Sequence, residues 1–239
     1  MDWRDVRIMN KEGKWGKQET LALIWLVFAI IFAISFSIWQ DLSIPLFTIL
    51  FLLPPLINLL TKKDARLIGM GSIPLGQTLK WAGINLAALI LVYAIFEPWS
   101  GAYAFLLEEA TAPGATDPTF FWLKEFGGLG GWIGMLLFSG VVSIFAEEIC
   151  FRGWLLNFLR PKIGSFWANI IQALIFTLPQ LIVVFIMPSP IMGIVYGLVY
   201  AFGAIGMING WVASQAGAIW PNLAAASIMN LILSVLILT

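Results

Sequence analysis

Long apolar runs recur along almost the whole of this 239-residue chain, and they constrain its fold more than any other feature. A helix needs ~20 mostly apolar residues to cross a hydrocarbon layer of ~30 Å, so this length holds about seven or eight crossings. Only 11% of the residues are charged, against roughly 25% in soluble domains. We therefore expect an all-α, polytopic transmembrane helix bundle, and hence a multi-pass integral membrane protein surrounded by membrane lipid. The apolar runs cover residues 20–39, 44–60, 76–99, 127–158, 165–187, 191–213 and 219–238.

The basic residues between these runs predict the orientation of the chain. Short loops rich in lysine and arginine stay on the cytoplasmic side more often than not. Such residues gather in residues 1–19, 61–66 and 160–162, whereas residues 100–126 are acidic and hold a single lysine. Crossings that start inside place the basic segments in the cytoplasm and the acidic loop outside. We expect residues 1–19 to be a cytoplasmic interfacial segment and residues 20–239 to form one transmembrane domain, with the N-terminus cytoplasmic.

Three charges interrupt the fourth apolar run, at Glu147, Glu148 and Arg152. One charged side chain at the centre of a transmembrane helix costs roughly 2.5–3.5 kcal/mol, so such a cluster marks a functional site or a tightly paired structural one. Residues four apart share a helix face, so Glu148 can pair with Arg152, while Glu147 is rotated about 100° away. We expect Glu148 to brace the bundle and Glu147 to face a wet cavity, where it could polarise water as a base. A brace alone, or the polar path of a transporter, would explain the same charges.

The neighbouring sequence adds motifs to this cluster. The run EEICFRGWLLNFLRP, which starts at Glu147, is followed by ALIFTLPQ and then by GWVASQAGAIWPNLAAASIMN. Together these runs resemble the CAAX-endopeptidase and bacteriocin-processing family of intramembrane proteases (CPBP, or Abi). The family pattern is Glu-Glu-x-x-x-Arg, then Phe-x-x-x-His, then His-x-x-x-Asn, each on its own transmembrane helix. The first motif is matched in full by Glu147, Glu148 and Arg152, and the resemblance covers about residues 131–231.

The second and third motifs are matched only in part. The second is present at Phe176 but has Gln180 in place of histidine, and the third keeps Asn230 but has Ala226 in place of histidine. In the family, the first glutamate and the first histidine are held to activate water, and the last histidine and asparagine to stabilise the oxyanion. The resemblance therefore implies that Glu147 is the base, with Gln180 and Asn230 as polar supports. A glutamine cannot exchange a proton near neutral pH, and an alanine side chain makes no hydrogen bond.

These departures predict a CAAX-protease-like pseudoprotease that binds a membrane-anchored or prenylated peptide or protein. An active intramembrane endopeptidase that uses Glu147 with Gln180 and Asn230 is one alternative, and a membrane transporter or scaffold is another. A zinc-dependent reading of the family's residues also exists, but this chain has no histidine. A divalent metal would have only carboxylates, amides and water as ligands, a set that suits magnesium or calcium better than zinc. Because the histidines are absent, we expect no cofactor. The net charge of zero predicts no nucleic-acid partner.

Overall fold

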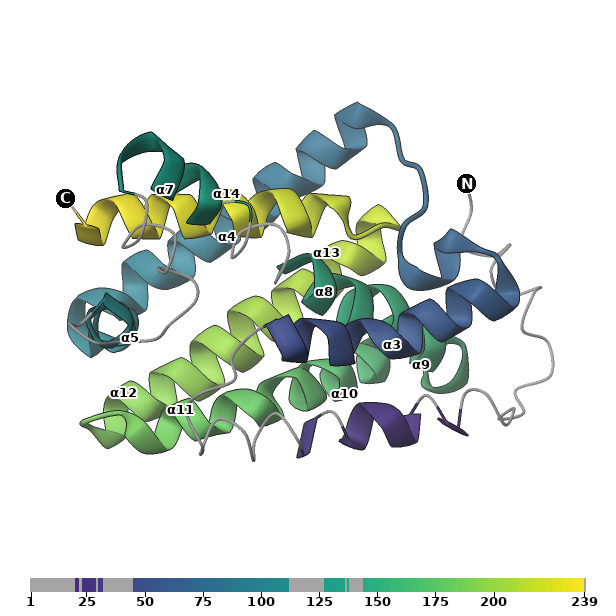
Figure 1. The fold of residues 1–239 in the computed structure, drawn as a ribbon, viewed down its shortest axis with the longest axis horizontal. Coiled ribbons are helices and arrows are strands. Elements are labelled where there is room, and N and C mark those ends of the chain that lie inside the picture. The colour runs from purple at the N-terminus through teal and green to yellow at the C-terminus, as the bar shows by residue number, and fades with distance from the viewer. Residues whose placement is uncertain are drawn as a thin grey trace.

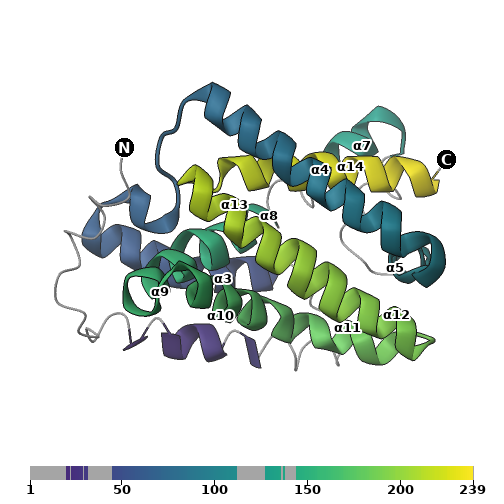
Figure 2. The same cartoon turned by 180° about the vertical axis from the view of Figure 1, so that it is seen from behind.

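The described part of the chain consists of helices joined by short loops and contains no strand. A computed structural model describes residues 20–21, 23–28, 30–31, 45–111, 127–135, 137 and 144–238 (Figures 1 and 2). Its first half contains α3 (Pro45–Lys62), the 3-10 turn η1 (Ala65–Ile68), α4 (Leu75–Ser100), α5 (Ala102–Thr111) and α7 (Gly128–Met135). The expected all-α class is confirmed for these residues and for the second half described next.

Three long helical rods and α14 make up the second half. The first rod joins α8 (Ile144–Glu147), the π-helical η3 (Glu148–Leu155) and α9 (Leu156–Ile163). The second joins α10 (Ser165–Thr177), the 3-10 turn η4 (Leu178–Gln180) and α11 (Leu181–Ile186). The third joins α12 (Pro190–Ile194), the π-helical η5 (Val195–Ile208) and α13 (Asn209–Ala216), and α14 spans Trp220–Leu238.

The apolar pattern of the sequence explains where most of these helices lie. Five of the predicted runs coincide with α3, α4, the α10–α11 rod, the α12–α13 rod and α14, within a few residues at each end. By length and composition, Leu75–Ser100 and Pro190–Ala216 are apolar enough to cross a membrane, at 26 and 27 residues. Residues 1–19 and half of the predicted crossing at 20–39 lie outside the described residues, as does part of the run at 127–158.

Two boundaries differ from the prediction. The predicted acidic loop begins with a helix, because α5 occupies Ala102–Thr111, and residues 112–126 lie outside the described part. The side chain of Glu97 accepts hydrogen bonds from the backbone N–H groups of Tyr103 and Ala104, at 3.0 and 2.8 Å, and so caps the start of this helix. The α9 helix also continues through Pro161 to Ile163, five residues past the predicted end of this run at residue 158.

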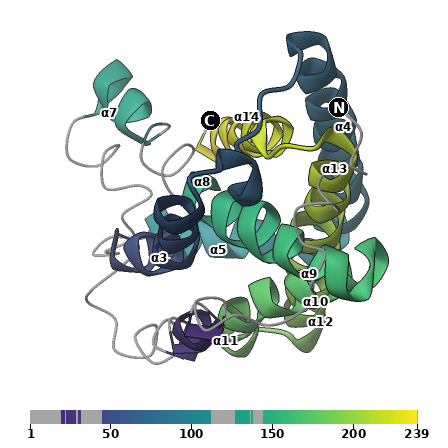
Figure 3. The ribbon, with the colours of Figure 1, turned by 90° about the vertical axis from the view of Figure 1, so that its right-hand side faces the viewer.

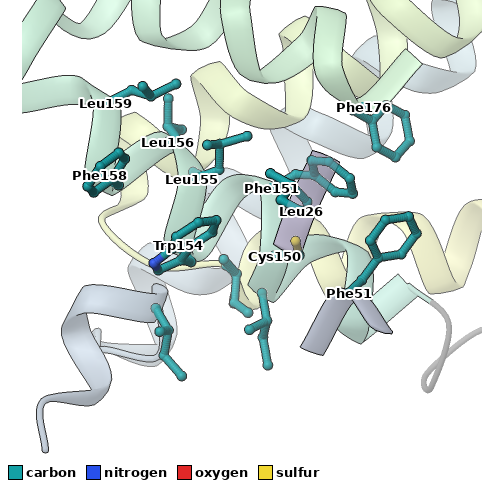
Figure 4. Close-up of a cluster of buried hydrophobic side chains, with 14 of the residues drawn as sticks. Leu26, Phe51, Cys150, Phe151, Trp154, Leu155, Leu156, Phe158, Leu159 and Phe176 are labelled. Atoms are coloured by element: carbon teal, nitrogen blue, oxygen red, sulfur yellow. The ribbon is translucent and has the colours of Figure 1, made fainter. Parts of the chain in front are cut away.

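The α8–η3–α9 rod lies at the centre of the bundle. Figure 3 looks along the bundle and shows this rod between α3, α14, α13 and α10. All eight residues of η3 are buried, as is typical of a helix with neighbours on every side. Its apolar side chains form the core drawn in Figure 4, where Phe151 lies between Phe51 and Phe176 with ring centroids 5.3 Å from each. Cys150 is a buried free thiol in the same core, which agrees with a packing role.

The η1 loop packs directly against the central rod. A Cβ atom on Gly153 would collide with the backbone carbonyl of Ile68, so only glycine permits this approach. Gly69 has φ +75°, a conformation that glycine adopts without strain, and its carbonyl accepts the N–H of Ile219 at 3.0 Å. The indole of Trp220 donates to the carbonyl of Gly71, at 3.0 Å. This loop therefore joins the first motif segment to the start of α14.

Candidate functional site

Glu148 is the best-satisfied charge of the candidate site. Its side chain is buried on η3, and Arg152, one turn further along, places Nη1 3.5 Å from Oε1. Two amide groups from other helices donate hydrogen bonds to the carboxylate. Asn209 donates to Oε1 at 3.2 Å, and Asn222 donates to Oε2 at 2.8 Å. A buried charge is tolerated when it is paired and hydrogen-bonded in this way. The geometry agrees with the expected pair and makes Glu148 a junction of η3, α13 and α14.

Arg152 contacts Phe176, the aromatic residue at the start of the second motif. Its guanidinium carbon lies 4.2 Å from the ring centroid of Phe176, and the face of an aromatic ring attracts a cation. Nη2 donates to the carbonyl of Ile205 on η5, at 2.5 Å. Arg152 therefore connects the central rod to both the α10–α11 rod and the α12–α13 rod. Phe176 supports this cation, and the two residues act together as a structural contact.

The polar network extends to residues that the motif analysis missed. Asn222 also donates to the backbone carbonyl of Asn209 at 2.8 Å, and its amide oxygen accepts from Asn85 on α4 at 3.0 Å. All three asparagines are at most 1% exposed. Amide side chains buried among apolar helices often link those helices by hydrogen bonds. The isolated asparagines within apolar runs were therefore a usable signal, although nothing in the sequence pairs them with Glu148.

Glu147 differs from its neighbour in its surroundings. It is the last residue of α8, its side chain is only partly buried, and no described residue forms a hydrogen bond or ion pair with its carboxyl group. Arg152 and the hydroxyl of Tyr196 are close enough to interact with it electrostatically. The two adjacent glutamates thus have different environments, as their 100° separation around the helix predicts. Glu147 is the carboxyl group that remains available to a ligand.

Gln180 lies beside the same tyrosine. It ends the short turn η4, which contains Pro179 and separates α10 from α11. Its amide oxygen accepts the hydroxyl proton of Tyr196 on η5, at 2.9 Å. The proline and the turn place the glutamine where the chain leaves one helix and enters the next. Tyr196 carries no motif signal, and the sequence analysis did not select it.

Ala226 and Asn230 follow Asn222 along one face of α14. Residues four apart share a helix face, and each step of four advances about 6 Å along the axis. Because Asn222 points toward Glu148, Ala226 lies about one turn beyond that contact and Asn230 about two turns beyond it. α14 packs against α8, the element that ends at Glu147. The side chain of Asn230 is partly buried and makes no hydrogen bond to another described residue.

The donor atoms of this region do not suit zinc. Zinc sites in proteins use histidine, cysteine and carboxylate ligands in a tetrahedral arrangement. No group of three or more such residues occurs among the residues that the structure describes, and Cys150 is buried in the apolar core. The side chains at the two motif positions, in η4 and α14, are an amide and a methyl group. The site therefore does not fit a zinc ion, and no step is assigned to one.

Comparison with known proteins adds one finding. The family model described as "Type II CAAX prenyl endopeptidase Rce1-like" matches residues 129–232. The match starts near α7 and ends within α14, so it includes every residue of the three motifs. Neither a curated protein nor a solved structure matches the chain.

Proposed function

We propose that this integral membrane protein is a degenerate member of the Rce1-like family of type II CAAX prenyl endopeptidases, whose model matches residues 129–232, and that it binds peptides without cleaving them at a family-like rate. The ligand we propose is a membrane-anchored or prenylated peptide or protein. The observation that carries the proposal is the identity of two side chains: Gln180 and Ala226 occupy the motif positions of the histidines. The Glu147 carboxyl group, which has no hydrogen-bond or ion-pair partner among the described residues, supports a site that can still hold a polar ligand.

The loss of two histidines affects two separate steps of peptide hydrolysis. A positioned acid-base group typically contributes ~10²–10⁴ to the rate, and Gln180 cannot exchange a proton near neutral pH. An oxyanion donor typically contributes ~10²–10³, and Ala226 offers none from its side chain. Glu147 could still polarise water, and Asn230 could still donate to a developing oxyanion. The expected result is a peptide-binding site with little hydrolytic power.

The proposal includes an arrangement in the membrane. We place about seven crossings in one domain, residues 20–239, with the N-terminus in the cytoplasm. The basic segments at residues 61–66 and 160–162 support this orientation. It puts Glu147, Glu148 and Arg152 in the cytoplasmic half of the central rod. A peptide would then reach the site from the cytoplasmic side.

Restoring the histidines tests the catalytic part of the proposal. The variant that combines Gln180→His with Ala226→His should cleave a prenylated, membrane-anchored test peptide, while the unaltered chain and each single variant should not. Each histidine supplies one of two different functions, so neither suffices alone. Adding Glu147→Gln to the double variant is the matched control and should abolish cleavage, because it removes the base while keeping the shape of the side chain. Cleavage is measured by mass spectrometry of the released fragment.

A second candidate, an active endopeptidase, is favoured by one observation: the Glu147 carboxyl group has no hydrogen-bond partner among the described residues. The same assay separates the two candidates. Cleavage by the unaltered chain that is lost in Glu147→Gln would establish the active enzyme and refute the pseudoprotease. Cleavage that persists in Glu147→Gln would place the chemistry at a different site.

A further inference from the structure

The contact between Tyr196 and Gln180 fixes the direction of an amide group at the candidate site. The hydroxyl of Tyr196 donates to Oε1 of Gln180, at 2.9 Å. The other end of the amide carries two N–H donors, and neither of them donates to a described residue. The oxygen is thereby held against η5, and the N–H groups are the part of Gln180 that remains for a ligand.

The carboxyl group of Glu147 is the complementary partner. It interacts electrostatically with the same tyrosine hydroxyl, and its oxygens have no donor among the described residues. Gln180 thus offers N–H donors, and Glu147 offers carboxyl oxygens that accept hydrogen bonds. A peptide unit carries the matching groups, a carbonyl oxygen that accepts and an N–H that donates.

We propose that Tyr196 is a positioning residue that holds Gln180 as a hydrogen-bond donor, so that Gln180 binds a backbone carbonyl group of the peptide ligand. This inference rests on the proposed function and names the group that the site recognises. Tyr196 acts through Gln180 and does not itself contact the peptide. The contact is partly buried, which reduces competition from water.

The chain supplies a matched control for the tyrosine hydroxyl. Tyr200 lies on the same helix η5, four residues after Tyr196, and its hydroxyl donates to Oε2 of Glu97 at 2.7 Å. Its ring stacks on Tyr93, with centroids 4.4 Å apart, away from Gln180. Tyr200→Phe therefore removes the same atom from the same helix without touching the Gln180 contact. Any general effect of losing a tyrosine hydroxyl from η5 should appear in both variants.

The binding test is a double-mutant cycle in lipid nanodiscs with a fluorescent farnesylated peptide as the probe. Tyr196→Phe should weaken binding about twofold to tenfold, the range expected for one neutral hydrogen bond, while Tyr200→Phe should leave it unchanged. Gln180→Met, which keeps the volume but removes the amide, should weaken binding at least as much. Adding Tyr196→Phe to Gln180→Met should then have no further effect, because the tyrosine acts only through the amide. Independent, multiplying losses would overturn the inference.

A second measurement needs no ligand. In protein labelled with ¹⁵N-glutamine, the side-chain amide signals of Gln180, assigned by their loss in Gln180→Met, should shift in Tyr196→Phe and stay unchanged in Tyr200→Phe. Signals that do not respond to Tyr196→Phe would overturn the inference and leave the proposed function standing if the peptide still binds. Signals that respond as expected, with no peptide bound by any variant, would support the positioning role but overturn both peptide recognition and the proposed function.

Discussion

The buried pair of Glu148 and Arg152 permits a quantitative prediction about stability. Replacing Arg152 with methionine removes the cation but leaves the Glu148 carboxylate at 1% exposure, with only two amide donors. Breaking a buried ion pair by removing one partner costs ~3–5 kcal/mol, because the remaining charge is uncompensated. Arg152→Met should therefore lower the free energy of unfolding by about this amount.

The double variant Glu148→Leu with Arg152→Met should be less damaged. No charge is left behind, and replacing a buried pair by apolar residues of similar volume is often nearly neutral. The structure adds a cost that the motif spacing does not show. Asn209 loses the acceptor for its amide N–H, whereas Asn222 keeps its second hydrogen bond to the carbonyl of Asn209. One orphaned buried donor costs ~1–3 kcal/mol, so the double variant should lose about that much.

Unfolding by sodium dodecyl sulfate in mixed micelles, followed by tryptophan fluorescence, measures these losses. Arg152→Met should be less stable than the double variant, whose free energy of unfolding should be higher by about 2 kcal/mol. Glu148→Leu alone completes the cycle, and its loss combined with that of Arg152→Met should exceed the loss of the double variant. Losses that simply add would show that the two charges do not depend on each other, and the brace would be refuted.

Two further predictions concern the packing of the loop and the orientation of the chain. Gly153→Ala should lower the free energy of unfolding by ~1–3 kcal/mol, and with it the melting temperature in detergent, because its Cβ would press on the carbonyl of Ile68. Gly83→Ala should leave the melting temperature unchanged, because a Cβ there meets nothing within 4 Å. Equal melting temperatures would refute the close approach. In a cysteine-free background, a cysteine at Thr116 should be labelled in intact cells by an impermeant thiol reagent, and one at Lys162 should not; the reverse pattern would invert the proposed orientation.

The sequence was informative where the relevant contacts are local. The four-residue spacing of Glu148 and Arg152 predicts their pairing, because a helix brings such residues onto one face. The apolar runs predict most helices for the same reason. The donors Asn209 and Asn222 are 61 and 74 residues away from Glu148, and no periodicity relates them to it. Their positions depend on how the helices pack, which a single sequence does not encode in a local pattern.

The same distinction applies to the loop and to Tyr196. Gly153 directly follows the first motif, but the sequence gives no indication that the backbone of η1 packs against it. The boundary error at α5 has a similar origin, since the cap comes from the side chain of Glu97, which precedes the helix by five residues. Tyr196 lies in an apolar run, where one hydroxyl hardly changes the pattern. Its partner Gln180 is 16 residues earlier, on a different rod.

The contacts divide the motif residues into two physical groups. Glu148, Arg152 and Phe176 are buried in contacts that join several helices, so their loss would destabilise the bundle whatever the protein does. Glu147 and Gln180 are only partly buried, so we expect their substitution to change the stability of the bundle little. Residues of the second group can change with little cost to folding, since substitutions away from buried networks usually alter stability by about 0.5 kcal/mol or less. The buried residues Glu148, Arg152 and Phe176 are therefore expected wherever this fold is retained, whereas position 180 can lose its histidine without loss of the fold.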